Sequence, residues 1–202
     1  NGAGKTTTLK ICTGLVRPDA GRVSICGLPL APDPVPARRQ MGFIPDEPHL
    51  YEKLTGREFL MLAGRLHGLA PEVCEREVAR WAERLDLGVY FNELAEGYSH
   101  GMRQRVVFAS ALLHGPKVLI VDEPTVGLDP VNTRRAKDIF REFAKAGGAV
   151  LLSTHAMDLA AEVGDEVAVI HHGRLMKRGP LAELRRSDQL EEVFLELTRE
   201  GV

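Results

Sequence analysis

The chain has 202 residues, of which 44% are hydrophobic and 27% are charged, a balance typical of a folded globular protein rather than a disordered one. Its 26 Lys and Arg residues nearly match its 28 Asp and Glu residues, giving a formal net charge of -2. This balance gives no electrostatic basis for binding nucleic acid, which depends on neutralising phosphates. The cysteines Cys12, Cys26 and Cys74 are widely spaced, which favours free thiols over a disulfide framework or a zinc site.

The first quarter of the chain alternates short helical and extended segments. Residues 6–15 are predicted to form a helix that ends before Pro18, and residues 21–27 a strand. A Pro-rich loop over 30–36 then leads to a short apolar strand over 41–45. No apolar run approaches the roughly 18 residues of a membrane-spanning helix, so we expect no direct membrane span.

The middle of the chain changes to helical periodicity between about Thr55 and Leu113. Two groups of apolar residues recur at spacings of three and four, the pattern of amphipathic helices: Phe59, Leu62, Ala63 and Leu66, then Val78, Trp81, Ala82 and Leu85. This segment is therefore predicted to be a mostly helical insertion between two halves rich in strands.

The last part of the chain returns to alternating strands and helices. The continuous apolar run at 117–124 predicts a strand buried on both faces. A helix follows over 129–145, with Asp129 as its N-cap and Pro130 at its first position. Further strands at 149–154 and 166–173 flank a short helix at 156–163, and residues 190–198 form an amphipathic helical tail. The order predicts an α/β protein with a mainly parallel sheet.

A phosphate-loop pattern stands at the start of the chain. The pattern is Gly, four residues and Gly-Lys-[Ser/Thr]; Gly4, Lys5 and Thr6 supply its end, and Asn1, Gly2 and Ala3 fill three variable positions. The first glycine would lie two positions before residue 1, so we expect the chain to begin inside the motif. Backbone N–H groups from residue 1 to Thr7 would hold ATP phosphates, Lys5 would reach the β/γ-phosphates and Thr6 would ligate Mg²⁺. The alternative is an ordinary Gly-rich turn.

Two carboxylates end the buried strand at 118–123. The carboxyl edge of a parallel sheet is where α/β proteins hold ligands. Asp122 would therefore hold Mg²⁺, and Glu123 would polarise a water in line with the γ-phosphate. The alternative is a solvated strand end, because Asp-Glu-Pro also simply terminates strands.

Four further segments resemble motifs of ATP-binding cassette (ABC) ATPases. "YSHGMRQRV" (98–106) resembles the signature motif, "TVGLDP" (125–130) the D-loop, "LLSTH" (151–155) the switch-histidine strand and "MGFIPDEPHLYEKLTGREFL" (41–60) the Q-loop with the start of the helical subdomain. With the phosphate loop, their order and spacing agree over nearly the whole chain. The chain resembles the nucleotide-binding subunit of an ABC transporter, closest to bacterial exporters.

The resemblance implies one ABC ATPase domain over 1–202, with a P-loop NTPase core at 1–50 and 115–180. A helical subdomain would occupy 51–114 and a helical tail 181–202. The cofactors would be ATP and Mg²⁺, and two ATPase subunits, as a homodimer or heterodimer, would sandwich two nucleotides. A polytopic membrane subunit would dock near 46–66, placing the protein at the cytoplasmic face of the cell membrane without nucleic acid.

The resemblance also assigns roles to single residues. In the signature segment, Ser99 and Gly101 would bind the γ-phosphate held by the second subunit, and His100 and Met102 would lie beside a phosphate. Asp129 would bridge the two sites, and His155 would contact the γ-phosphate and orient the water with Glu123. The Q-loop glutamine falls on Asp46, a shorter and charged metal contact that Glu47 could replace. His100 and Met102 depart from the usual glycine and glutamine.

Each of these residues also has a purely structural interpretation. Ser99 and Asp129 could only cap their helices, and His155 could be a core histidine. The Arg38-Arg39 and Arg103/Arg105 pairs are interpreted as solvated faces. The alternative function is a soluble ABC ATPase acting on ribosomes or DNA, although the long coiled coil and the double cassette of such proteins have no counterpart here. A non-hydrolytic module would lack Glu123.

Overall fold

The computed structural model describes residues 2–125 and 127–184. Asn1 and the expected helix at 190–198 therefore lie outside the described residues. In chain order the elements are α1 (Lys5–Cys12), β1 (Ser24–Ile25), β2 (Leu28–Pro29), α2 (Val35–Arg38), β3 (Met41–Ile44), α3 (Gly56–Leu66), α4 (Pro71–Arg84), short 3₁₀ helices at Val89–Asn92 and Ala95–Gly97, α5 (His100–Leu112), β4 (Val118–Asp122), α6 (Pro130–Lys145), β5 (Ala149–Ser153), α7 (Met157–Val163), β6 (Glu166–His171), β7 (Arg174–Pro180) and α8 (Leu181–Leu184).

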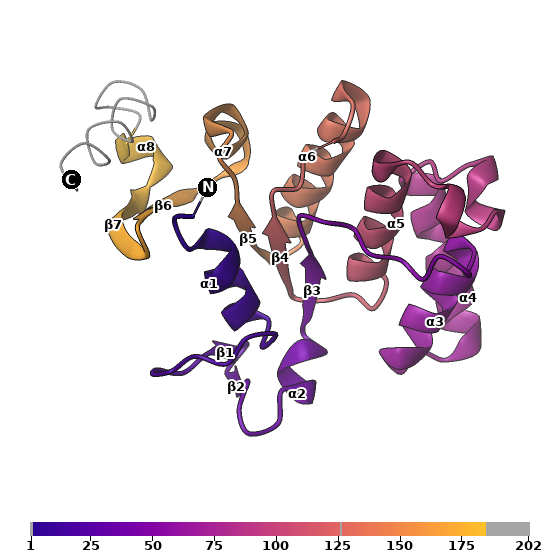
Figure 1. Ribbon diagram of the computed structural model, residues 1–202, viewed down its shortest axis with the longest axis horizontal. Helices are drawn as coiled ribbons and strands as arrows, with labels where there is room; N and C mark the ends of the chain where they lie inside the picture. The colour runs from indigo at the N-terminus through magenta and orange to yellow at the C-terminus, as the bar shows by residue number, and fades with distance from the viewer. Residues whose placement is uncertain (1, 126, 185–202) are drawn as a thin grey trace.

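A three-stranded parallel sheet, in the order β3-β4-β5, forms the centre of the molecule. Its register places Ile44 beside Val121 and Asp122 beside Ser153, so the carboxyl ends of all three strands meet at one edge. This is the upper edge in Figure 1, where the three arrowheads point and where α1 begins. The predicted parallel arrangement is confirmed for these strands.

Two antiparallel hairpins were not anticipated from the sequence. The expected strand over 21–27 is only Ser24–Ile25 and folds back onto β2, while β6 pairs with the unpredicted β7. Each turn has two residues with positive φ: Cys26 (51°) with Gly27 (78°), and His172 (45°) with Gly173 (73°). A two-residue turn of this kind reverses a strand with the twist that a hairpin needs. Glycine at the second position supplies that conformation without steric cost.

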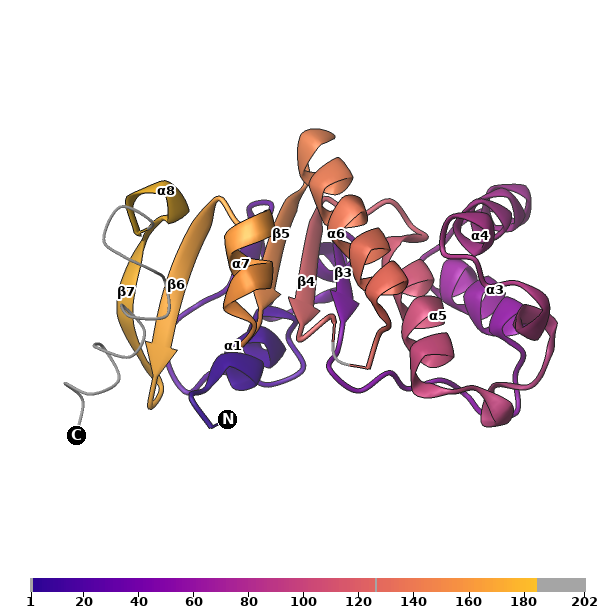
Figure 2. The same cartoon turned by 90° about the horizontal axis from the view of Figure 1, so that it is seen from above.

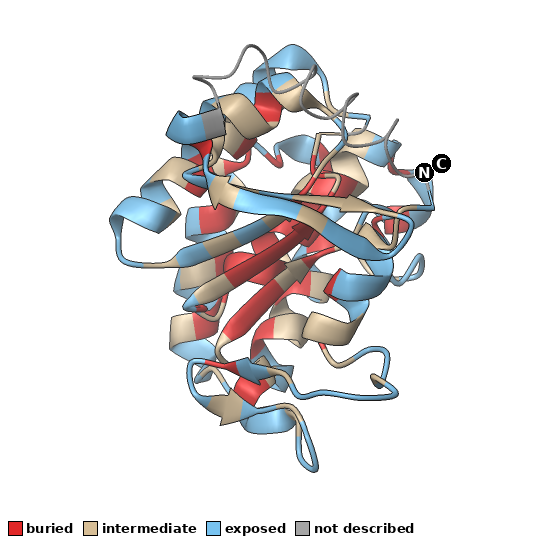
Figure 3. Ribbon diagram, turned by 90° about the vertical axis from the view of Figure 1, so that its left-hand side faces the viewer, coloured by how far each residue is buried: buried red, intermediate tan, exposed pale blue. Residues whose placement is uncertain are grey.

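Both faces of β4 are buried, as the continuous apolar run predicted (Figure 3). On one face, Leu119 and Val121 join a large apolar cluster that includes Phe108 of α5 and Phe140 of α6. On the other face, Ile120 packs in a smaller cluster with Leu9 of α1. Since residues alternate between the faces of a strand, one short strand fixes helices on both sides of the sheet.

Helices α3, α4 and α5 lie at one end of the molecule and the β6–β7 hairpin at the other (Figures 1 and 2). The helical end shares its apolar cluster with the sheet, because Trp81 and Leu60 belong to the same cluster as Val121. Helix α3 begins at a capping box, in which Thr55 accepts from the Glu58 amide and Glu58 accepts from the Thr55 amide. Among the described helices, none has both the length and the apolar character needed to cross a bilayer.

Candidate nucleotide-binding and hydrolytic site

The phosphate-loop residues lie where the chain enters α1. Gly4 is the N-cap with φ 96°, and no side chain in the described part of the chain caps this end of the helix. The first-turn amides of α1 are therefore available to an anion, and the helix dipole favours negative charge there. Lys5 is half-buried, whereas Thr6 and Thr7 are exposed. Of the predicted ATP-binding residues, Gly2 to Thr7 thus form one continuous loop and first helical turn.

The turn between β6 and β7 supports this loop, a contact that sequence reasoning missed. The Gly173 amide donates to the Ala3 carbonyl oxygen at 2.9 Å. A Cβ added to Gly4 would lie 3.4 Å from the Gly173 Cα, so the two backbones pack closely. The only signal in the sequence was the His-His-Gly stretch at 171–173, which is typical of a turn but does not indicate its partner.

The carboxylates at the end of β4 are held in different ways. Asp122 is only 2% exposed, and its Oδ1 accepts a hydrogen bond from Ser153 Oγ on β5. Glu123 has φ 46°, a strained conformation for a non-glycine residue, and its amide donates to the Ser153 carbonyl at 3.1 Å. The predicted pair of neighbouring acids therefore sits on the carboxyl edge, with Asp122 fixed by the adjacent strand.

Glu123 and His155 are brought together, as the resemblance implied. His155 Nδ1 lies 2.9 Å from Glu123 Oε2, and the His155 amide donates to the same oxygen at 3.3 Å. The His155 side chain is 69% exposed, so its interpretation as a core histidine is wrong. The exposed imidazole and the largely buried carboxylate together present a proton acceptor and a hydrogen-bonding group at the sheet edge.

Asp46 follows β3 and lies in the electric field of the other acids. The pKa of Asp46 is raised, first by partial burial and then by the charges of Asp122, Glu123 and Glu47, while His100 opposes the rise. Such a cluster of negative charge is relieved by a cation. The residues thus combine carboxylate oxygens with the exposed Thr6 hydroxyl, the oxygen donors that Mg²⁺ prefers.

A cavity of about 770 Å³ connects these groups to the helical end of the molecule. Thr6, Asp46, Glu47 and Asp122 line it on the sheet side, with Phe59 and His114 toward the helices. No three His, Cys, Asp or Glu side chains within the described ranges lie close enough to form a complete metal site. The donor set nevertheless fits Mg²⁺, which takes one or two carboxylates and completes its shell with waters and substrate phosphates.

The signature residues begin α5 as predicted. Ser99 is the N-cap, and its Oγ accepts from the Met102 amide at 3.3 Å. The His100 ring packs on Gly127, where an added Cβ would come within 2.4 Å of the ring. Helices α1 and α5 lie on opposite sides of the β3–β5 sheet (Figure 1). The phosphate loop and the signature residues of one chain are therefore on opposite sides of that sheet.

Asp129 caps α6, as the sequence predicted. Its carboxylate accepts from the Asn132 amide at 2.9 Å and from Asn132 Nδ2 at 2.6 Å. These hydrogen bonds lower the pKa of Asp129 because they favour the charged form. The capping roles of Ser99 and Asp129 are confirmed, while their contacts across a dimer stay predictions.

The interpretation of the arginine pairs as solvated faces is wrong for three of the four. Arg38 donates to the Thr13 and Gly14 carbonyls just after α1, at 3.2 and 2.7 Å, and is half-buried. Arg103 donates to the Tyr98 carbonyl at 3.2 Å, and Arg105 to the Asp86 carbonyl at 2.6 Å. A guanidinium has five donors and can satisfy carbonyls at helix ends, which a sequence pattern does not reveal. Only Arg39 is exposed.

Comparisons with known proteins agree with this geometry. A family model described as ABC transporter matches residues 1–126. YxlF, an uncharacterized ABC transporter ATP-binding protein of Bacillus subtilis, is 40% identical over 94% of this chain. The daunorubicin/doxorubicin resistance ATP-binding protein DrrA of Streptomyces peucetius is 37% identical over 93% of this chain. The chain spans 62% of the length of YxlF and 57% of that of DrrA.

A solved structure of an ATP-binding subunit of an ABC transporter is also similar. It superimposes with a TM-score of 0.90 and 38% identity, covering 98% of this chain and 85% of the other. The likeness thus extends over the described helices and sheet and not only over the short motifs. The chain therefore belongs to the ABC transporter family and has the P-loop NTPase fold.

Proposed function

We propose that the whole protein binds and hydrolyses MgATP and uses the energy to drive export through a polytopic membrane subunit. The observation that carries this proposal is the shared edge at which the α1 N-terminus, Asp122 and the Glu123–His155 pair meet. Export is supported by the similarity to DrrA, whose name assigns it to drug resistance. The transporting complex would lie at the cytoplasmic face of the cell membrane.

The chain's own residues would divide the work at this edge. The amides of Gly2 to Thr6 and the Lys5 ammonium would bind the phosphates. Glu123 would accept a proton from the attacking water, and His155 would hold Glu123 and the γ-phosphate in line. Thr6, Asp122 and Asp46 would hold Mg²⁺, which supplies neutralisation of charge on the phosphates when bound.

A second ATPase subunit would complete each site. Ser99, His100, Gly101 and Met102 stand at the N-terminus of α5, on the other side of the sheet from α1, and would face the nucleotide of the partner subunit. Asp129, exposed at the start of α6, would bridge the two sites. A head-to-tail pair with two-fold symmetry places each signature helix opposite a phosphate loop.

The membrane partner would dock at the cavity that reaches from Asp46 to α3. This cavity joins the metal-binding edge to Phe59 on the helical side, so a docked segment would contact both. Substrate identity would be determined by the membrane subunit. Purification from native membranes in mild detergent tests the partner: a stoichiometric polytopic membrane protein is expected, while recovery with ribosomes or DNA alone would overturn the transport role.

The hydrolytic step is tested with Glu123→Gln in the whole protein. The amide keeps the size of the side chain but cannot accept the proton, so ATP binding should persist while hydrolysis falls at least about 100-fold. The ATP-bound dimer should also accumulate, which size-exclusion chromatography with MgATP would detect. Hydrolysis at the wild-type rate would remove Glu123 from this role.

A further inference from the structure

Helix α7 directly follows the loop that carries His155. It has only seven residues, Met157–Val163, and within residues 2–125 and 127–184 no side chain caps its N-terminus. Leu159 is its buried residue, with 2% exposed. Because a helix this short is not stable by itself, its position depends on its contacts with the rest of the protein. The position of His155 therefore depends on how α7 is attached.

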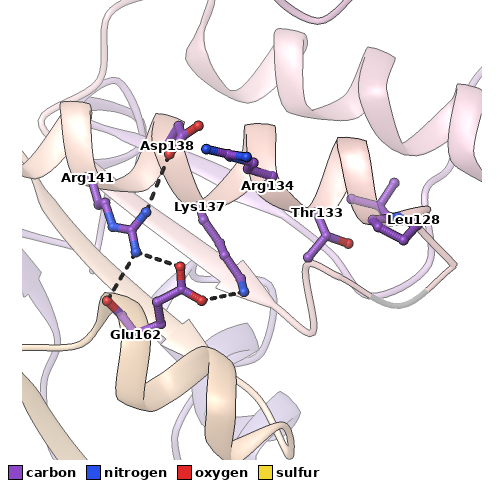
Figure 4. A pocket seen from close by; sticks show the side chains of 8 residues that line it. Leu128, Thr133, Arg134, Lys137, Asp138, Arg141 and Glu162 are labelled. Atoms are coloured by element: carbon purple, nitrogen blue, oxygen red, sulfur yellow. Dashed lines mark hydrogen bonds and ion pairs between the residues drawn. The ribbon is translucent and has the colours of Figure 1, made fainter.

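An ion-pair cluster attaches α7 to α6, and Figure 4 shows both cations of α6 pointing to one carboxylate of α7. Lys137 Nζ lies 2.6 Å from Glu162 Oε2, and Arg141 Nη2 lies 2.7 Å from Glu162 Oε1. Arg141 also donates to the Glu162 carbonyl oxygen at 3.4 Å, in the last turn of α7. Both carboxylate oxygens and one helix-end carbonyl are thus bound from α6.

The surroundings of the cluster make these contacts stronger than those of an isolated surface pair. The Lys137 side chain is only 16% exposed, and Arg141 is also paired with Asp138 at 3.4 Å. The hydrogen bonds from Lys137 and Arg141 lower the pKa of Glu162, so the carboxylate is held in its charged form. A single exposed ion pair contributes little to stability, but a network with a shared partner holds its groups in one geometry.

We propose that Glu162, held by Lys137 and Arg141, is a positioning residue for ATP hydrolysis. It fixes α7 on α6, so that the loop before α7 presents His155 to Glu123. Asp129 caps the N-terminus of α6, so the same cluster also links the position of Asp129 to that of His155. This inference rests on the proposed role of Glu123 in hydrolysis, and the three residues lie on α6 and α7, outside the phosphate loop.

The test compares steady-state hydrolysis by the wild type, Glu162→Gln, Lys137→Met and the double variant, in the whole protein. Each single variant should lower kcat about 5- to 10-fold, because small displacements of a catalytic group have large effects on rate. KM for ATP should stay within about twofold, since the phosphate loop is untouched. The fall in kcat of the double variant should be no more than about twice that of either single variant, because both substitutions break the same ion-pair cluster.

A matched control is Glu166→Gln, which removes another exposed ion pair, with Arg178 at 3.0 Å on the β6–β7 hairpin. Its kcat should match the wild type, and thermal unfolding should show all variants folded. Three results would overturn the positioning role. They are an unchanged kcat in Glu162→Gln, a rise in the KM of Glu162→Gln as large as its fall in kcat, or a fall in the kcat of Glu166→Gln as large as that of Glu162→Gln. If the wild type itself hydrolyses no ATP, the proposed function fails instead, and the two failures are distinguished.

Discussion

A half-buried histidine pair that lines the cavity leads to a specific prediction about acid sensitivity. His67, at the end of α3, and His114, after α5, stack with ring centroids 3.6 Å apart and an interplanar angle of 9°. His114 Nε2 donates to the Met41 carbonyl at 3.0 Å, while its Nδ1 is buried and has no hydrogen-bond partner among the described residues. Burial, with a smaller contribution from His67, lowers the pKa of His114 from 6.5 to about 4.

The sign and size of the effect of pH on stability follow from the difference between the pKa of His114 in the folded chain and in the unfolded chain. Between pH 6.5 and 4 the unfolded chain binds the proton at this histidine and the folded chain does not, so stability falls as the pH falls through this window and is constant above it. At 1.36 kcal/mol per pKa unit, the full gap corresponds to about 3 kcal/mol. Because His114 is only partly enclosed, we expect about 1–2 kcal/mol of this loss by pH 5.

The assay is urea-induced unfolding at pH 7.5 and pH 5.0, for the wild type and His114→Asn. Other groups titrate in both proteins, so the difference between their two pH responses isolates His114; the variant should lose about 1–2 kcal/mol less on acidification. The exposed His49 provides the control, since His49→Gln should respond to pH as the wild type does. If His114→Asn and the wild type lose equal stability, burial of His114 does not have the assigned effect.

Three further predictions concern the site and its supports. Ser153→Ala removes the hydroxyl that donates to the buried Asp122 and should destabilise the protein by about 1–3 kcal/mol in urea unfolding; no change would mean that another donor replaces it. Arg38→Ala should lower stability by about 1–2 kcal/mol by freeing two carbonyls after α1, whereas Arg39→Ala, at an exposed position, should not; equal effects would contradict the capping role. Asp46→Asn should raise the Mg²⁺ concentration for half-maximal hydrolysis several-fold if Asp46 is the metal contact, and a larger rise in Glu47→Gln would transfer that role to Glu47.

The parts of the fold that the sequence predicted well are those governed by repeating patterns. The apolar run of β4 requires burial on both faces, and Asp129 followed by Pro130 marks a helix start with little ambiguity. These patterns also placed Asp122 and Glu123 at the carboxyl edge of the sheet, because acidic residues at the end of a buried parallel strand lie at that edge. The candidate site was therefore largely readable from its motifs.

The parts that the sequence did not reveal depend on contacts between distant segments. The pattern at 166–173 predicted a strand but could not indicate that its partner is β7 or that their turn supports the phosphate loop at Ala3. Likewise, Arg38 and Arg39 are adjacent and chemically identical, yet only Arg38 reaches the end of α1. A long, flexible side chain finds its partner only after the backbone has folded, so its role is not encoded in local spacing.

The same distinction explains why the hydrolytic pair needs support from outside its motifs. Asp122 is fixed by the backbone ladder between β4 and β5 and by the hydroxyl of Ser153 on the paired strand, so its position follows from the pairing of these two strands. Glu123, in contrast, lies just beyond β4 in a strained conformation, and His155 lies in an exposed loop between β5 and α7. A strained backbone conformation such as that of Glu123 persists only when surrounding contacts hold it. In the arrangement that we propose, the attachment of α7 to α6 provides this support, and it connects the chemistry at the sheet edge to Lys137 and Arg141 on α6, which no nucleotide-binding motif includes.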